Sequence, residues 1–260
     1  MKKKDKFIFI AGPCVIEDRA STIDIASYLK DLTASYPVEF IFKASFDKAN
    51  RTSIDSYRGP GLKKGIKILQ AVKEKVGVSI LSDVHSCQQV KDLKTVLDII
   101  QIPAFLCRQT DLILAAAKTK LTVNLKKGQF VSPQDVEYII KKIESTGNKK
   151  IIITERGSCF GYNNLVVDFR SFLIMKDFNY PVIFDATHSL QRPSAKRGIS
   201  GGDVKFVEPL SLAAVACGVN GIFIETHPNP RKALSDRYTS FPLIKVKKFL
   251  DKVMKIRNSL

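Results

Sequence analysis

The feature that most constrains this chain is an alternation of short apolar runs with amphipathic segments, repeated eight times. The runs have the length of buried strands, and the segments are long enough for helices. Strands that are each followed by a helix form a parallel sheet, because parallel neighbours need a crossover connection. We expect strands at 7–11, 39–44, 79–82, 98–102, 122–125, 150–154, 181–185 and 221–225.

The helices are expected in the segments between these runs. Ser21 is predicted to cap the first helix, and Pro133 fits the first turn of the fifth. Residues 188–202 are predicted to form a long loop. The helices are expected at 21–32, 62–75, 88–96, 111–119, 133–144, within 165–178, at 207–217 and at 243–254.

The number of units and the chain length together favour a closed barrel over an open sheet. The chain has 260 residues, of which 45% are hydrophobic and 26% are charged. About 250 residues is the usual size of a (β/α)8 barrel. No GxGxxG follows the first strand, which argues against a doubly wound dinucleotide fold. We therefore predict one α/β domain over residues 1–260, a (β/α)8 TIM barrel.

Several classes of protein are disfavoured by the composition. No apolar run approaches the roughly 20 residues that span a membrane. The run at 7–11 is too short for a signal-peptide core, so a cytoplasmic protein without membrane association is predicted. The five cysteines are odd in number and widely spaced, which is not typical of a disulfide framework.

The net charge of +17 favours anionic partners. Nucleic acid is one alternative, but the lysines are spread over the expected helices and no aromatic-plus-basic stacking motif accompanies them. We predict that the protein does not bind nucleic acid and that phosphorylated metabolites are the better candidates.

Polar residues follow nearly every expected strand at the same end. This is the end where a barrel of this type carries its site. Charged residues scattered over the surface would not recur at the same end of successive strands. The residues are Cys14, Lys43, Lys48, Asp83, His85, Arg108, Gln109, Lys126, Gln129, Glu155, Arg156, Asp185, His188, Glu225 and His227.

Two subsets of these strand-end residues and their neighbours separate by chemistry. Five cations at one opening would repel one another without an anion, so they predict a substrate with more than one phosphate or carboxylate. Thiolate, imidazole and carboxylate side chains together suit Zn²⁺ or Fe²⁺, although a buried thiol and a hydrogen-bonded histidine remain alternatives. The cations are Lys43, Lys48, Arg51, Lys126 and Arg156, and the possible ligands are Cys14, His188, Glu225 and Asp236.

Long ordered motifs over nearly the whole chain carry a family resemblance. They include residues 11–17, 42–51, 102–112, 126–130, 154–157, 160–168, 185–189 and 225–228. In these stretches the chain resembles the 3-deoxy-D-manno-octulosonate 8-phosphate synthases. The resemblance implies a homotetrameric transferase that condenses phosphoenolpyruvate with D-arabinose 5-phosphate and water, in a step toward lipopolysaccharide.

The resemblance also implies roles for single residues. With a cysteine at position 14, the chain resembles the metal-dependent class of the family. This resemblance implies that Zn²⁺, Fe²⁺ or Mn²⁺ is bound by Cys14, His188, Glu225 and Asp236. Asn50, Arg51 and Thr52 would hold the sugar phosphate, with Thr52 where serine is expected. Lys48, Asp83, His85 and Asp236 are the candidate catalytic residues. Phosphoenolpyruvate would be held by Lys43, Ser45, Lys48, Ala104, Lys126, Gln129 and Arg156.

Two alternative functions would also use these cations to bind phosphorylated sugars. A related synthase would use erythrose 4-phosphate and make a seven-carbon product, and the cations do not discriminate between the two sugars. A non-catalytic barrel that only binds phosphosugars would leave Cys14 and Asp236 without a function.

Overall fold

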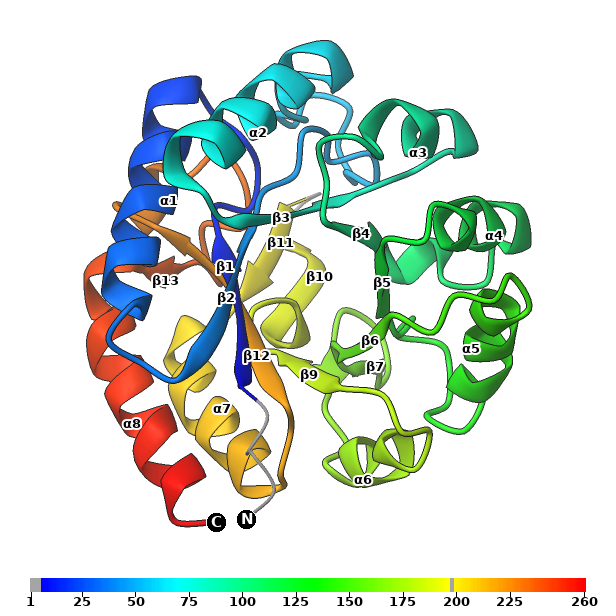
Figure 1. Cartoon of the computed structure of the whole chain (residues 1–260). Coiled ribbons are helices and arrows are strands. Elements are labelled where there is room, and N and C mark those ends of the chain that lie inside the picture. Colours follow the sequence, from blue (N-terminus) through cyan, green and yellow to red (C-terminus); the bar gives the residue numbers. More distant parts are fainter. Residues whose placement is uncertain (1–5, 197–198) are drawn as a thin grey trace.

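The computed structural model describes residues 6–196 and 199–260, and eight of its strands form a closed parallel barrel (Figure 1). Neighbours pair in chain order, and the last barrel strand returns to the first, where Ile8 lies beside Gly221. This closure confirms the predicted (β/α)8 barrel. The strands are β1 (Phe7–Gly12), β2 (Val38–Lys43), β3 (Ser79–Asp83), β4 (Ile99–Ile102), β5 (Thr122–Lys126), β6 (Ile151–Glu155), β9 (Val182–Asp185) and β12 (Gly221–His227).

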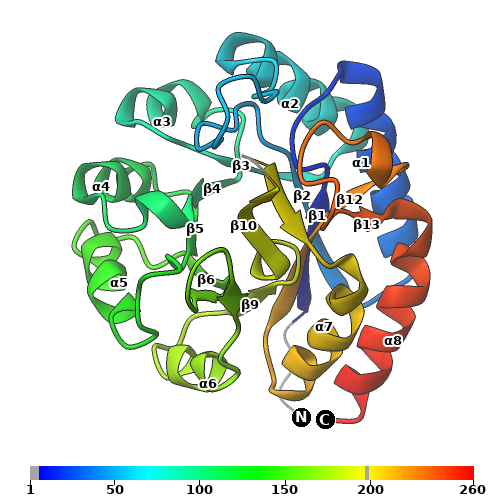
Figure 2. The same cartoon turned by 180° about the vertical axis from the view of Figure 1, so that it is seen from behind.

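A helix follows each barrel strand and packs on the outside of the barrel (Figures 1 and 2). The apolar faces of the helices cover the outward side chains of the strands. The strands are therefore buried on both faces, which explains their nearly continuous apolar sequence. The helices are α1 (Arg19–Thr33), α2 (Leu62–Val76), α3 (Cys87–Leu93), α4 (Thr110–Lys118), α5 (Val136–Glu144), α6 (Arg170–Lys176), α7 (Val207–Ala216) and α8 (Val246–Asn258).

Short extra strands follow the carboxyl ends of three barrel strands. The hairpin of β7 (Ser158–Cys159) and β8 (Leu165–Val166) follows β6, and β13 (Phe241–Pro242) pairs with the end of β12. A second hairpin, of β10 (Gln191–Lys196) and β11 (Ile199–Gly202), follows β9 and lies in front of the barrel in Figure 2. The prediction of a plain loop here is wrong; glycines, which are depleted in strands, conceal β11 in the sequence.

Two predicted helix starts also differ from the structure. Asp18, not Ser21, caps α1: its Oδ1 accepts a hydrogen bond of 2.9 Å from the Ser21 backbone N–H. Pro133 lies in a turn before α5, which begins at Val136, because the first bonds run over three residues, such as Val136 N–H to the Pro133 oxygen at 3.3 Å. Aspartate is itself one of the preferred N-cap residues, so Asp18 was a capping candidate in the sequence.

The interior of the barrel changes character along the strands. At the amino end, inward side chains form a closed apolar cluster of Ile8, Ile10, Ile41, Leu81, Ile99, Ile152, Ile183 and Phe223. Successive inward positions are two residues apart in a strand. Two residues further on, the inward side chains are Lys43, Asp83, Gln101, Asp185 and Glu225, all buried. The fold therefore places charged groups at the carboxyl end of the barrel.

None of the helices in the described part of the chain combines the length and the apolar composition needed to cross a bilayer.

Candidate active site

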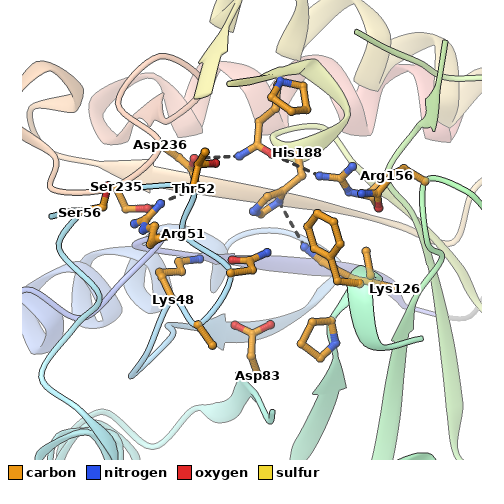
Figure 3. A pocket seen from close by; sticks show the side chains of 18 of the residues that line it. Lys48, Arg51, Thr52, Ser56, Asp83, Lys126, Arg156, His188, Ser235 and Asp236 are labelled. Carbon is orange, nitrogen blue, oxygen red and sulfur yellow. Dashed lines mark hydrogen bonds between the residues drawn. The ribbon is translucent and has the colours of Figure 1, made fainter. Parts of the chain in front are cut away.

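The carboxyl end of the barrel opens into a cavity of about 960 Å³ (Figure 3). This volume falls in the range of small-molecule sites. Its walls come from the ends of the barrel strands and from the loops after them. Lining residues that the sequence predicted include Lys43, Lys48, Asn50, Arg51, Thr52, Asp83, His85, Ala104, Lys126, Gln129, Arg156, His188 and Asp236.

Glu225 is the centre of the charge arrangement. The Glu225 side chain is fully buried, and its Oε1 lies 2.9 Å from Lys43 Nζ and 3.5 Å from Lys48 Nζ. Burial alone would raise the pKa of Glu225, but His188, Lys43 and Lys48 hold that pKa well below its usual range. Glu225 therefore remains a carboxylate that neutralises two lysines.

A second buried pair lies across the cavity. Lys126 Nζ donates to Asp185 Oδ2 at 2.6 Å, lies 3.2 Å from His188 Nδ1 and sits over the Phe223 ring at 4.1 Å. Figure 3 shows Lys126 and His188 directed toward each other. Asp185 also accepts the backbone N–H of His188 at 2.9 Å. These contacts fix the Lys126 ammonium at the cavity wall.

These pairs correct one step of the sequence argument. The cations were expected to need an external anion, but Glu225 and Asp185 already neutralise part of their charge. Two guanidinium groups differ, because within residues 6–196 and 199–260 neither forms an ion pair. Arg156 Nη2 donates to Gln191 Oε1 at 3.2 Å, and the buried Arg51 Nη2 has no hydrogen-bond partner. These arginines are the cations most available to a ligand.

Three of the four predicted metal ligands form a compact group. The ligand atoms of Cys14, Glu225 and Asp236 lie within 4.8 Å of one another, and Cys14 Sγ is 2.9 Å from Asp236 Oδ2. His188 stands beside this group, with its Nε2 3.4 Å from Glu225 Oε1. Gln191 Nε2 donates to Asp236 Oδ1 at 2.8 Å and holds that carboxylate toward Cys14.

The chemistry of this group fits a divalent cation. Burial raises the pKa of the Cys14 thiol well above its usual value, and the Asp236 and Glu225 carboxylates raise it further. Glu225 Oε2 is buried without a hydrogen-bond partner. A cation would relieve the repulsion among these groups and would satisfy that oxygen, and thiolate with carboxylate is a donor set that Zn²⁺ and Fe²⁺ accept.

Asp83 and His85 differ in their surroundings. Asp83 accepts hydrogen bonds from Ser45 Oγ and Gln101 Nε2. Burial would raise the pKa of Asp83, but Lys43 and Lys48 lower that pKa below its usual value. His85 Nδ1 is buried without a hydrogen-bond partner. Asp83 is therefore held as an anion, whereas His85 keeps one ring nitrogen available.

The sequence profile described as the DAHP synthetase I family matches residues 2–260. A protein of Desulfatibacillum aliphaticivorans named 2-dehydro-3-deoxyphosphooctonate aldolase is 54% identical over 97% of this chain and 92% of its own length. The chain belongs to the DAHP synthetase I family. Family members with the same name from Geobacter sulfurreducens and Campylobacter jejuni subsp. doylei are 53% and 51% identical over 96% and 97% of this chain, and over 92% and 98% of their own lengths.

The sites expected from the family resemblance lie close together. Asn50 and Thr52 are exposed on the cavity rim, and Ala104 begins a short turn after β4. Ser45, Cys14 and Glu225 lie behind the cavity wall and contact residues that line it. Gln129 lines the cavity, and its buried Oε1 lacks a hydrogen-bond partner.

Not every predicted strand-end residue reaches the cavity. Glu155 instead lies 3.5 Å from the buried Lys127, and His227 lies 3.6 Å from Glu17. Arg108 and Gln109 are exposed outside the cavity. Sequence reasoning missed Gln101, Gln191 and Ser235; only Gln101 carried a signal, because it stands two residues after the inward Ile99.

Proposed function

We propose that this chain condenses phosphoenolpyruvate with D-arabinose 5-phosphate and water to give 3-deoxy-D-manno-octulosonate 8-phosphate and inorganic phosphate. This is a transferase step toward lipopolysaccharide, carried out in the cytoplasm. The names of the family members support the reaction. The cavity supports it because some of its buried cations are stabilised by neighbouring carboxylates and others are not.

The observation that carries the proposal is the contrast among the buried cations. Burial lowers the pKa of Lys126 and of Arg156, and the nearby carboxylates do not restore either value. Burial also acts on Lys48, but Cys14, Glu225 and Asp83 more than offset it and raise its pKa. The charged forms of Lys126 and Arg156 are therefore under-stabilised, and a bound phosphate would stabilise them.

These cations suggest how the two substrates lie. Lys126 and Arg156 would bind the phosphate of phosphoenolpyruvate, with Gln129, Ala104, Lys43, Ser45 and Lys48 around the rest of it. Arg51, Asn50 and Thr52 would bind the phosphate of the sugar at the opposite rim. Holding both anions in one cavity lowers the entropic barrier to their reaction.

The reaction then needs two bonds to form and one to break. Carbon 3 of phosphoenolpyruvate attacks the sugar aldehyde, whose oxygen takes up a proton, and water adds at carbon 2. The resulting hemiketal phosphate breaks its bond between carbon 2 and the phosphate oxygen and leaves a ketone. Lys126 and Arg156 stabilise the departing phosphate. His85 and Asp236 are candidates to move the protons, and Asp83 contributes a fixed negative charge beside Lys43 and Lys48.

Cys14, His188, Glu225 and Asp236 are proposed to hold a divalent metal, Zn²⁺, Fe²⁺ or Mn²⁺. Such an ion supplies Lewis-acid chemistry, which acidifies a water molecule or polarises an aldehyde oxygen. A metal held by these residues would face the same cavity, because Asp236 and His188 line it.

The proposal is tested by phosphate release from phosphoenolpyruvate with each aldose phosphate. We expect release with arabinose 5-phosphate and little with erythrose 4-phosphate. Arg51→Met should raise the KM for the sugar phosphate at least about tenfold, as the loss of a charge-assisted hydrogen bond does. The control is Arg58→Met, because Arg58 lies in the same loop but is exposed and pairs with Asp47 at 2.6 Å.

The family description gives a second candidate its support, because DAHP names the seven-carbon product of the related reaction. Faster release with erythrose 4-phosphate would replace the proposal by that reaction. Binding of both ligands without release would leave a phosphosugar-binding barrel.

We also propose that the working enzyme is a homotetramer. Four aromatic side chains in the loops at the carboxyl end of the barrel are exposed, Phe105 by 55%, Phe130 by 56%, Phe160 by 72% and Tyr162 by 98%. Aromatic side chains are enriched in protein interfaces. Sedimentation equilibrium should give the mass of four chains, and a monomer at micromolar concentration would contradict this.

A further inference from the structure

A row of buried polar side chains crosses the barrel interior next to the cavity. Its members come from consecutive strands: Asp83 at the end of β3, Gln101 in β4, Asn124 in β5 and Thr154 in β6. Asp83 is level with Gln101, and Gln101 is level with Asn124, in the strand register. Gln101, Asn124 and Thr154 are at most 1% exposed. Such groups are costly to bury unless each one is hydrogen-bonded.

Every member of the row has a partner. Thr154 Oγ1 donates to Asn124 Oδ1 at 2.6 Å, and Asn124 Nδ2 donates to Gln101 Oε1 at 2.9 Å. Gln101 Nε2 then donates to Asp83 Oδ1, and Ser45 Oγ donates to Asp83 Oδ2 from the other side. The row is continuous from β6 to the loop after β2.

One negative charge sets the direction of the whole row. An ionised carboxylate only accepts hydrogen bonds, so Gln101 must turn its NH₂ group toward Asp83. Its oxygen then faces Asn124, which must present its own NH₂ group, and the Asn124 oxygen faces the Thr154 hydroxyl. Each orientation follows from the one before, and reversing any amide would place two acceptors together in a buried site.

The row connects residues outside the cavity with residues that form its wall. Asp83 and Gln101 line the cavity, whereas Asn124 and Thr154 do not. Lys43 Nζ lies 3.8 Å from Asp83 Oδ2, so the Asp83 carboxylate faces one of the proposed substrate-binding cations. The hydroxyl proton of Ser45 is directed to Asp83, which leaves the Ser45 lone pairs for other partners.

We propose that Asn124 and Thr154 are positioning residues for the condensation: through this row they fix the side-chain amide of Gln101 and keep Asp83 in place as an anion beside Lys43. The inference rests on the proposed function and adds to it two residues that do not touch the substrates. It also assigns an order to the row, with a smaller effect on turnover at its end, Thr154, than at its centre, Asn124.

Two isosteric changes test this order. Thr154→Val removes the last donor, and Asn124→Leu breaks the row in the middle. We expect kcat to fall about 10-fold and about 100-fold, the range for buried hydrogen-bonding groups left without partners, with the KM for both substrates changed less than kcat. Thr154→Ser keeps the hydroxyl and should restore kcat to within about twofold of the wild type.

The chain offers matched controls for both changes. Thr33 is buried in α1 and donates to Leu29 O at 2.7 Å, and Asn148 is buried near β6 and donates to Ala117 O at 3.0 Å and Leu121 O at 2.9 Å. Thr33→Val and Asn148→Leu remove equally buried groups away from the row. They should lower the melting temperature while leaving the kcat of the folded enzyme within about twofold.

A pH profile separates positioning from simple stability. In Asn124→Asp the new carboxyl group must stay protonated to donate to Gln101 Oε1. As pH rises it ionises, two carboxylates flank Gln101, and the kcat of the variant falls at a lower pH than that of the wild type. A kcat profile with the same pH dependence as the wild type, with only the melting temperature reduced, would overturn the inference.

The outcomes distinguish this inference from the proposed function. A wild-type chain that releases no phosphate with arabinose 5-phosphate overturns the proposed function, and this inference with it. An active wild type whose Asn124→Leu variant is as active as Asn148→Leu overturns this inference alone.

Discussion

The two ends of the barrel interior are built from the same eight strands but hold opposite kinds of side chain. At the amino end, residues such as Ile183 and Phe223 pack into an apolar cluster. Two residues further along the same strands stand Asp185 and Glu225, buried and charged. A step of two residues along a strand therefore separates the apolar layer that stabilises the barrel from the charged layer that forms the candidate active site.

This difference has an energetic meaning. Burial of apolar side chains stabilises the folded chain. Buried ion pairs contribute little stability or are destabilising, because the cost of desolvation offsets the attraction between the charges. The carboxyl end is therefore not built for stability. Its charges are retained at a cost, which we attribute to the binding and conversion of anionic substrates.

The largest expected effect comes from leaving one charge of the carboxyl end without its partner. Lys126→Met should destabilise the chain by about 3 to 5 kcal/mol, because Asp185 remains buried with less compensation. Adding Asp185→Asn should recover most of this loss, while phosphate release stays abolished in both variants. Urea denaturation measures the free energies, and a double variant as unstable as the single one would contradict this.

A cavity created by mutation at the amino end should lower stability without abolishing turnover. Ile183→Ala removes a fully buried side chain from the apolar cluster and should cost about 2 to 5 kcal/mol of the free energy of unfolding. The kcat of the folded fraction should remain within about threefold of the wild type. A loss of turnover as large as that of Lys126→Met would show that the two ends are not independent.

Loss of the Cys14 thiol should lower turnover through the loss of the metal. Cys14→Ala should lower kcat at least about 100-fold and abolish the binding of one equivalent of metal, since even the loss of an outer partner of a metal ligand costs about 10- to 100-fold. The control is Cys107→Ala, a buried cysteine outside the group of Cys14, Glu225 and Asp236. Metal content and phosphate release are measured on both.

The smallest effect is a difference in acid sensitivity. The pKa values of Asp83, Asp185 and Glu225 are lowered in the folded chain, so the unfolded chain binds more protons below about pH 4. Their stabilisation is present above that pH and is lost as pH falls. Urea denaturation between pH 7 and 3 should give Ile183→Ala the wild-type slope and the Lys126→Met/Asp185→Asn double variant a shallower one; equal slopes would exclude Asp185 as a contributor.

Much of this comparison could be predicted from the sequence. Apolar runs of strand length identify the barrel strands, and polar residues just after them mark the carboxyl end. The expectation about the substrates came from the family resemblance of motifs such as residues 102–112, not from spacing. The number of cations at the strand ends overestimated the need for an external anion. The sequence did not show that Glu225 and Asp185 would pair with lysines.

The polar row within the strands could not be predicted for a different reason. Asn124 and Thr154 are ordinary polar residues in otherwise apolar runs, and only the stagger between strands brings them into contact. The pairing of Lys127 with Glu155 likewise depends on the register of two neighbouring strands, since Lys126 at the end of β5 lies beside Thr154 in β6. Contacts between strands carry no local signal, whereas strand ends do.

Phosphate release before and after removal of metal tests the central claim most directly, namely that the charged end of the barrel is a metal-assisted synthase site. The enzyme would be treated with a strong chelator, assayed with phosphoenolpyruvate and arabinose 5-phosphate, and assayed again with Zn²⁺, Fe²⁺ or Mn²⁺ restored. The account predicts that release stops with the chelator and returns with metal. Release that continues unchanged in the chelator would contradict the metal assignment of Cys14, His188, Glu225 and Asp236.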